Sequence, residues 1–171
     1  MSMVRSPFAT AALVALAALP ACAQGPRQFR PAGESCVIAT VIDGDTFRCR
    51  GGARVRLIGI DAPERSQGAA YQASREALGR IAGAGDTVRL DRDVAPRDQY
   101  GRELAWAWRD STLVNEAMVA RGYAILFTVP PNVKYVERIA EAQRRARAAG
   151  AGLWATDGFA CAPSDRRRGR C

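Results

Sequence analysis

Three short β-rich segments separated by tight turns lie between Cys36 and Ile60, and they constrain the fold more than any other part of the chain. The segments are residues 37–42, 45–50 and 54–60, joined by Asp43-Gly44 and Gly51-Gly52. Turns of this kind connect neighbouring antiparallel strands. The sequence therefore predicts an antiparallel meander at the start of the domain.

The following residues mix helical and extended patterns, which differ in the spacing of their apolar residues. The expected order is a helix at 68–81, a strand at 86–91, a polar loop at 92–101, a strand at 103–108, a helix at 113–121, an extended piece at 123–129 and a helix at 133–149. We expect Ser111 or Thr112 to cap the second helix and Gly122 to end it.

Five short strands with interposed helices predict an α+β fold. A five-stranded OB-type β-barrel with about three helices accommodates this order. Residues 36–156 would form the domain, with a flexible lead-in at 24–35 and an exposed, basic, cysteine-containing tail at 157–171. With 171 residues, the chain is long enough to bury its own core.

Residues 1–23 have the pattern of a cleavable signal peptide. Arg5 supplies a positive charge, residues 8–19 are apolar but too short to span a bilayer, and residues 21–23 form a small-residue cleavage site. We expect cleavage after Ala23 and a periplasmic or secreted protein. Residues 19–22 also resemble a lipoprotein signal, in which Cys22 would carry a lipid anchor. No transmembrane span is expected in the mature chain.

Export would place the remaining four cysteines in an oxidising compartment, where an even number indicates two disulfides. Three pairings of Cys36, Cys49, Cys161 and Cys171 are possible. Cys36 and Cys49 flank the predicted hairpin and Cys161 and Cys171 bracket the tail, so we favour these two pairs. A zinc site is the alternative, but the spacings do not match and the chain has no histidine.

The chain is strongly basic, with a net charge of +8, and 24 of its 25 basic residues are arginine. Basic proteins favour polyanionic partners such as nucleic acid, although arginine-rich composition alone is weak support. The absence of histidine excludes Ser-His-Asp triads, ribonuclease chemistry with paired histidines, and His-ligated metals. Any catalysis must depend on carboxylates, arginines and a hard cation.

Four carboxylates lie within 22 positions around the predicted hairpin: Asp43, Asp45, Asp61 and Glu64. Asp43 can simply be a turn residue. Asp45 begins a predicted strand and Asp61 ends one, so pairing of these strands would bring the two carboxylates together. Converging carboxylates repel each other unless a cation lies between them, and Ca²⁺ binds carboxylates, carbonyls and water.

Two arginines accompany these acids. Arg56 faces away from Val55 and Leu57 in a predicted strand, and Arg102 precedes another strand. Guanidinium groups bind phosphate oxygens in bidentate fashion, and a carboxylate such as Glu64 can activate water. A cation, two arginines and a spare carboxylate are the groups that phosphodiester hydrolysis requires. Ordinary surface salt bridges are the alternative interpretation.

Five short motifs follow one another along the chain: Asp43-Gly44-Asp45-Thr46, Arg56-Leu57, Gly59-Ile60-Asp61-Ala62-Pro63-Glu64, Asp98-Gln99-Tyr100-Gly101-Arg102 and Leu113-Val114-Asn115-Glu116. Their combination resembles the staphylococcal nuclease (thermonuclease) family, with order and spacing kept from about Cys36 to Trp154. The resemblance implies an OB barrel and a Ca²⁺-dependent nuclease that acts on DNA and RNA, generally leaving 3′-phosphate ends.

The resemblance also implies roles for individual residues. Asp45, Asp61 and the carbonyl of Ala62 would bind Ca²⁺, and Asp43 and Thr46 would support them. In the same pattern, the general base or water-positioning residue is Glu64, the phosphate-binding pair is Arg56 and Arg102, and the neighbour of the substrate phosphate is Tyr100.

The chain departs from the family pattern at several positions. The family's archetype has threonine at Ala62, where a main-chain oxygen suffices, and lysine at Gln99, so one phosphate contact is absent here. It also has tyrosines around Thr128 and Pro130 that wall the nucleotide pocket. Aromatic stacking contributes about 1–3 kcal/mol per base, so we expect base affinity or preference to differ.

Two other functions are compatible with the same fold. Some domains of this kind keep the barrel, lose the catalytic residues and serve as adaptors for nucleic acid or protein. A structural protein of the cell envelope is a further alternative. An enzyme is favoured because the full catalytic set is present: Asp45, Arg56, Asp61, Glu64 and Arg102. We also expect a monomer.

Overall fold

The fold is that of a computed structural model, which describes residues 33–171. The predicted signal peptide at 1–23, including Cys22, lies outside the described residues. Most of the predicted lead-in at 24–35 lies outside them as well. Within residues 33–171, no helix is both long enough and apolar enough to span a membrane.

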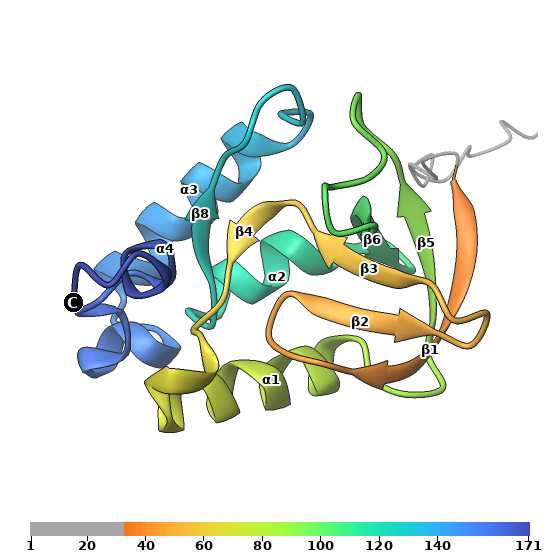
Figure 1. The fold of residues 1–171 in the computed structure, drawn as a ribbon. Coiled ribbons are helices and arrows are strands. Elements are labelled where there is room, and N and C mark those ends of the chain that lie inside the picture. Colours follow the sequence, from red (N-terminus) through yellow and green to blue (C-terminus); the bar gives the residue numbers. More distant parts are fainter. Residues whose placement is uncertain (1–32) are drawn as a thin grey trace, which may run out of the picture.

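Five strands form a closed barrel (Figure 1). They are β1 (Glu34–Val41), β2 (Thr46–Cys49), β3 (Arg54–Leu57), β5 (Thr87–Asp91) and β6 (Glu103–Arg109). β1 pairs antiparallel with β2 and β5, β2 with β3, and β5 with β6, while β3 and β6 pair in parallel and close the ring. The predicted α+β barrel of the OB type is confirmed.

The predicted strand at 54–60 is two strands rather than one. β3 ends at Leu57, and β4 (Gly59–Asp61) leaves the barrel to pair antiparallel with β8 (Ile125–Phe127). Gly59 permits this break, because its φ is +77° and a Cβ there would lie 2.5 Å from Cη2 of Trp106. Asp61 therefore ends a separate two-stranded sheet rather than a barrel strand.

The start of β1 and the segment before α2 also differ from the predictions. β1 begins at Glu34, inside the predicted lead-in, because its first residues pair with β5. A short strand, β7 (Thr112–Leu113), pairs with β6. Helix α2 (Val114–Ala120) therefore has Leu113 as its N-cap, without a side-chain hydrogen bond, and the predicted cap by Ser111 or Thr112 is wrong.

Four α-helices are found among residues 33–171: α1 (Ala69–Ile81), α2, α3 (Val136–Ala148) and α4 (Pro163–Arg167). Three short 3-10 helices accompany them: η1 (Arg65–Gln67), η2 (Gly152–Ala155) and η3 (Asp157–Phe159). The first three α-helices were predicted, and α4 in the tail was not. Figure 1 shows α4 on the side of β4 and β8 that faces away from the barrel.

The barrel strands alternate between the core and the surface. Val55 and Leu57 are fully buried, and Arg56 between them lies on the outer face, as predicted. Trp106 and Trp108 are also buried and belong to the core. The barrel thus presents Arg56 to the outside from a rigid strand.

Both favoured disulfides are present. Cys36–Cys49 joins β1 to β2 with 5.6 Å between the Cα atoms. Cys161–Cys171 closes a loop around α4 with a Cα–Cα distance of 6.0 Å. The second disulfide closes the end of the predicted tail into a loop.

Candidate active site

A cavity of about 560 Å³ lies where β2 and β3 meet the chain that follows β4 and the C-terminal helix α4. We call it the acidic cleft. Most of the predicted site residues line it: Asp43, Asp45, Arg56, Ala62, Glu64, Tyr100 and Arg102. Two further predicted residues, Thr46 and Asp61, are buried at 1% and 0% exposure. The structure therefore brings together residues that lie as far apart in the sequence as Asp43 and Arg102.

Asp45 is held at the start of β2 by three contacts. Its Oδ1 accepts a hydrogen bond from the Thr46 hydroxyl at 3.0 Å, and its Oδ2 accepts one from the Ala62 amide at 2.9 Å. Nη2 of Arg56 lies 3.0 Å from the same Oδ2. Asp45 is buried, with 6% of its surface exposed, and its carboxylate points toward Ala62 in the chain that follows β4.

Asp61 converges on the same guanidinium. Nη2 of Arg56 lies 3.3 Å from Oδ1 of Asp61, so one nitrogen bridges the Asp45 and Asp61 carboxylates. Burial raises the pKa of Asp61, and hydrogen bonds from Arg167 together with the charge of Arg56 act in the opposite direction. The two carboxylates therefore meet at one nitrogen of Arg56, but the predicted reason is wrong, because β4 pairs with β8 rather than with the hairpin strand.

Asp43 lies beside this pair and shapes its backbone. Its Oδ1 accepts a hydrogen bond from the Asp45 amide at 3.1 Å, the geometry of an Asx turn. Burial and the negative charge of Asp45 raise the pKa of Asp43 to about 6. Gly44 is required between them, because a Cβ there would lie 1.9 Å from the Ser74 hydroxyl of α1.

Arg102 faces the cleft from the loop that precedes β6. Asp98 orients it, because Oδ2 of Asp98 accepts from Nε at 2.7 Å and Oδ1 accepts from the Arg102 amide at 3.0 Å. Tyr100 is 72% exposed, and its ring centroid lies 5.6 Å from Cζ of Arg102. The motif from Asp98 to Arg102 thus builds one arginine–tyrosine unit at the rim of the cleft.

Arg167 of α4 is the site residue that the sequence analysis missed. It was assigned to an exposed tail, yet it donates to Oδ1 and Oδ2 of Asp61 at 3.0 and 2.9 Å and also contacts Oε1 of Glu64. Burial by itself lowers the pKa of Arg167, but the bonds to both carboxylates raise it overall. The bracketing by Cys161 and Cys171 was the available signal, because a disulfide between them closes the basic segment into a loop instead of leaving it as a free end.

The carboxylates suit a hard cation by their chemistry. Asp45 and Asp61 share one guanidinium, and burial raises the pKa values of Asp43 and Asp61. Oxygen ligands of this kind suit Ca²⁺, with the Ala62 carbonyl within the same segment. As the side chains stand, no cluster of three or more His, Cys, Asp or Glu residues among residues 33–171 has the arrangement of a metal site.

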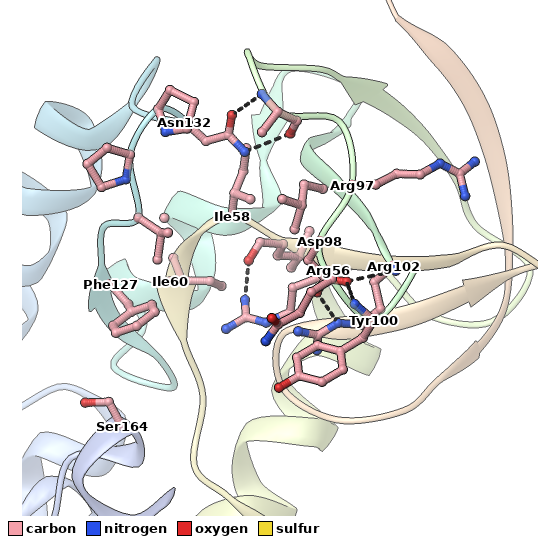
Figure 2. Close-up of a pocket in the computed structure, with 18 of the residues that line it drawn as sticks. Arg56, Ile58, Ile60, Arg97, Asp98, Tyr100, Arg102, Phe127, Asn132 and Ser164 are labelled. Carbon is pink, nitrogen blue, oxygen red and sulfur yellow. Dashed lines mark hydrogen bonds and ion pairs between the residues drawn. The ribbon is translucent and has the colours of Figure 1, made fainter. Parts of the chain in front are cut away.

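A second cavity of about 560 Å³, which we call the adjoining groove, continues from the acidic cleft. Five residues line both: Arg56, Tyr100, Arg102, Phe127 and Arg167. Figure 2 shows Tyr100 and Arg102 on one side of the groove, Phe127 on the other, and Ser164 of the tail near its lower end. Val129, Pro130 and Pro131 continue the apolar wall where the family pattern has tyrosines.

Asn115 of α2 fixes the segment that carries the site. Its Nδ2 donates to the carbonyls of Ile58 and Ala105, and its Oδ1 accepts from the Ala107 amide at 2.9 Å. Ile58 is the residue between β3 and β4, so this buried side chain holds the break that separates Arg56 from Asp61. It is a positioning residue that does not line either cavity.

Comparisons with known proteins agree with this geometry. The family model described as Staphylococcal nuclease homologue matches residues 54–156. A thermonuclease of Staphylococcus intermedius is 34% identical over 132 residues, which cover 71% of this chain and 77% of that protein. A thermonuclease of Staphylococcus hyicus is 32% identical over 124 residues, which cover 68% of this chain and 73% of that protein. An uncharacterized endonuclease of Haemophilus influenzae is 35% identical over 138 residues, covering 78% and 73%.

Proposed function

The chain belongs to the staphylococcal nuclease family, and from this premise we propose that it is an exported, calcium-dependent phosphodiesterase of DNA and/or RNA. The relatives support a hydrolytic nuclease as the general class. The observation that carries the proposal is the meeting of Asp45 and Asp61 at one nitrogen of Arg56, in a cleft that Glu64 and Arg102 also line.

Each side chain has a defined task in this proposal. Asp45, Asp61 and the Ala62 carbonyl would hold Ca²⁺, which neutralises charge on the reacting phosphate when it is bound. Arg56 and Arg102 bind the non-bridging phosphate oxygens. Asp43 and Thr46 support the ligands, since they bond to the backbone and the carboxylate of Asp45 respectively.

Glu64 is the proposed base or water-positioning residue. It is 34% exposed at the side chain and lines the cleft, so a water molecule has access to it. Water attacks phosphorus while Glu64 accepts its proton, an oxygen–phosphorus bond forms, and the bond to the 5′-oxygen breaks. The 5′-oxygen takes up a proton from solvent as it leaves, Glu64 returns its proton to solvent, and the 3′-phosphate end remains on the other fragment.

The adjoining groove would bind the nucleotide next to the scissile phosphate. Tyr100 lies at the rim shared by both cavities, and Phe127 forms part of the apolar wall. The chain lacks the tyrosines that the family pattern has around Thr128 and Pro130. We therefore expect weaker base stacking and little base preference.

We also propose that the protein is exported and that it acts as a monomer. Two disulfides are typical of proteins in oxidising compartments, which supports a periplasmic or secreted location. Cleavage after Ala23 would release the protein, and lipidation of Cys22 is the alternative in which it stays anchored. Mass spectrometry of the mature N-terminus distinguishes the two outcomes.

Activity with and without Ca²⁺ tests the proposed function directly. The purified mature protein should cut single- or double-stranded DNA or RNA in Ca²⁺, lose this activity in excess EGTA, and leave 3′-phosphate and 5′-hydroxyl ends. Full activity in EGTA would contradict the cation requirement. Binding of nucleic acid without cleavage under any of these conditions would instead favour a binding module.

The variant Glu64→Gln tests the chemical role of this residue. We expect turnover to fall by about 10²–10⁴-fold with little change in DNA affinity, because the amide cannot accept the proton. Glu76→Gln is the matched control, since Glu76 is an exposed α1 residue paired with Arg80 outside the cleft. Equal rates for Glu64→Gln and wild type would remove Glu64 from the mechanism.

A further inference from the structure

Arg167 holds the two carboxylates that the proposed chemistry requires to be available. Its guanidinium donates to both oxygens of Asp61, at 3.0 and 2.9 Å, and its Nη1 also contacts Glu64. Asp61 is fully buried and does not itself line the acidic cleft, whereas Arg167 does. Arg167 therefore stands between Asp61 and the cleft.

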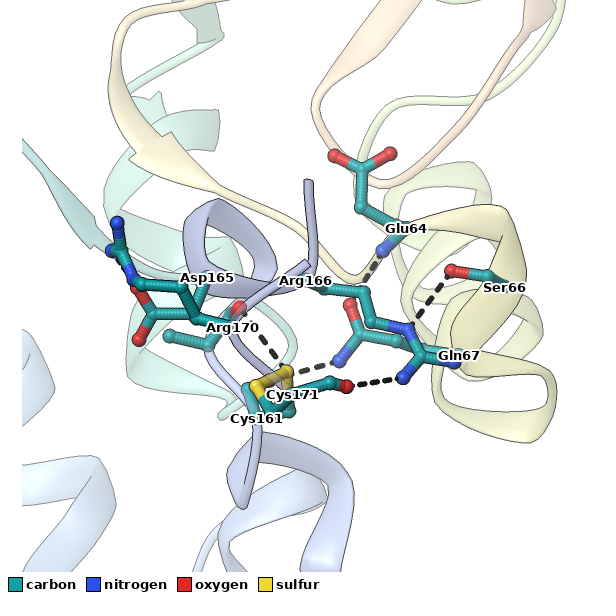
Figure 3. Close-up of a disulfide and its surroundings, with 9 residues drawn as sticks. Glu64, Ser66, Gln67, Cys161, Asp165, Arg166, Arg170 and Cys171 are labelled. Atoms are coloured by element: carbon teal, nitrogen blue, oxygen red, sulfur yellow. Dashed lines mark hydrogen bonds and ion pairs between the residues drawn. A yellow bond between two sulfur atoms is a disulfide. The ribbon is translucent and has the colours of Figure 1, made fainter. Parts of the chain in front are cut away.

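The C-terminal loop, residues 161–171, delivers Arg167 to this position. The Cys161–Cys171 disulfide closes the loop around α4. Figure 3 shows how it is fastened to η1: Arg166 donates to the Ser66 hydroxyl at 3.2 Å, and Gln67 donates to the Cys161 carbonyl at 2.9 Å. Gln67 also accepts a hydrogen bond from the Glu64 amide at 2.8 Å, so the loop is coupled to the backbone of Glu64.

Charge balance explains why Asp61 has this partner. Without Arg167, Asp45 and Asp61 would share the single guanidinium of Arg56, with Asp43 close by. A buried carboxylate without a full counter-charge is strongly unfavourable. The position next to Asp61 thus requires a positive group, which is either this guanidinium or a cation.

The two positive groups are mutually exclusive at Asp61. Arg167 engages both carboxylate oxygens, and a cation bound to the same oxygens would lie against a guanidinium of like charge. Arg167 can leave without losing every contact of the loop, since the bonds of Arg166 and Gln67 to other residues do not involve it. Its guanidinium also lies over the Phe127 ring, 5.8 Å from the centroid, on the edge of the adjoining groove.

We propose that Arg167 is an internal counter-ion that blocks the cation site of the free protein, and that it leaves Asp61 and Glu64 when a divalent cation binds. This inference rests on the proposed calcium-dependent function. The C-terminal loop is accordingly an autoinhibitory latch, which lowers the apparent affinity for the cation. Nuclease activity would begin only at cation concentrations that displace Arg167.

Calorimetric titration with Ca²⁺ measures this competition without measuring activity. We expect Arg167→Gln to bind Ca²⁺ about tenfold more tightly than wild type, or better, because the competing charge is gone. Arg170→Gln is the matched control: it removes the same charge from the same loop, where Arg170 pairs with Asp165 outside the cleft. Its affinity should stay within about twofold of wild type. Circular dichroism confirms that each variant is folded.

Two further measurements make the test independent of one substitution. The double variant Cys161→Ser/Cys171→Ser loosens the loop and should also raise Ca²⁺ affinity. In wild type, the NMR signals of the Arg167 guanidinium should change to those of a solvent-exposed arginine as Ca²⁺ saturates the site, because only this side chain has to leave Asp61. Unchanged guanidinium signals at saturating Ca²⁺ would overturn the latch.

The outcomes separate the latch from the function on which it rests. Equal or weaker Ca²⁺ binding by Arg167→Gln, with clear binding by wild type, overturns the latch and leaves the calcium-dependent nuclease intact. Absence of Ca²⁺ binding in wild type and in Arg167→Gln overturns both. Loss of binding in Asp61→Asn confirms that the measured site is the one that Arg167 occupies.

Discussion

Asp93 shows how a single carboxylate organises one end of the barrel. It accepts hydrogen bonds from Nε1 of Trp106 at 3.0 Å and from the Lys134 amide at 2.9 Å. Partial burial by itself raises the pKa of Asp93, but these bonds and one from the Val94 amide lower it overall, below the ordinary value of 3.8. The ionised form is therefore favoured in the folded protein.

This shift predicts a defined pH dependence of stability. A carboxylate whose pKa is lowered by folding stabilises the protein above its unfolded pKa, and this contribution disappears as the pH falls through the folded value. We expect Asp93→Asn to lower the free energy of unfolding by about 1 kcal/mol at pH 6, with the difference shrinking below pH 4 or so. Urea unfolding at several pH values measures this.

Asp110→Asn serves as the control for this prediction. Asp110 is an exposed turn residue with a φ of +54°, a conformation that asparagine also adopts. Its substitution should leave the free energy of unfolding nearly unchanged at every pH. A pH-independent difference between Asp93→Asn and wild type would mean that the charge of Asp93 has no role.

At the scale of elements, the break between β3 and β4 decides where the site forms. Gly59 turns the chain out of the barrel, and Asn115 of α2 bonds to Ile58 at the same point. Arg56 stays on the barrel, while Asp61 moves to the sheet that β4 makes with β8. The acidic cleft lies between these two supports, so its geometry depends on this break.

Gly59→Ala tests the requirement for glycine at the break. The new Cβ would lie 2.5 Å from the buried Trp106 ring. The alanine would also have to adopt the φ of +77° that Gly59 has. We expect a loss of roughly 2–5 kcal/mol in the free energy of unfolding, from backbone strain and overpacking together. Gly85→Ala is the control, since its φ of +92° brings strain but no atom lies within 4 Å. Equal losses in both variants would show that the contact with Trp106 is harmless.

At the scale of the whole molecule, the two disulfides act on different units. Cys36–Cys49 lies in the barrel, where both residues are buried, at 5% and 8% exposure. Cys161–Cys171 holds a surface loop whose last residues are exposed. The first therefore constrains the cooperative unit, whereas the second constrains a segment that can open locally.

Removal of each disulfide should therefore have different effects on global stability. We expect Cys36→Ala/Cys49→Ala to lower the free energy of unfolding by about 3 kcal/mol, the value typical of a loop of this length. Cys161→Ser/Cys171→Ser should cost clearly less in the same urea titration, because the loop can detach while the barrel stays folded. A larger loss for the second pair would place the tail inside the cooperative unit.

Much of the site could be predicted from residues close in the sequence. The turn residues at 43–44 and 51–52 and the alternation in 54–57 required a meander with Arg56 on its outer face. The motifs around Asp45, Asp61 and Arg102 identified the groups that meet in the cleft. The roles of these groups as cation ligands, base and phosphate-binding residues stay predictions, because they concern ligands rather than the fold.

The sequence by itself determined the antiparallel meander at the start of the domain, the order of the later elements and the chemical types of the site residues, since local spacing and turn chemistry encode them. The barrel was expected from the resemblance to the family, because the spacing of the strands is compatible with other α+β arrangements. Only the tertiary structure decided that the strand at 54–60 breaks at Gly59 and that Arg167 lies on Asp61. The strand breaks at Gly59 because the Trp106 ring, 47 positions away in the sequence, occupies the space that a side chain would need there. Arg167 pairs with a carboxylate 106 positions away because a buried charge requires a counter-charge, and sequence spacing does not specify which arginine supplies it.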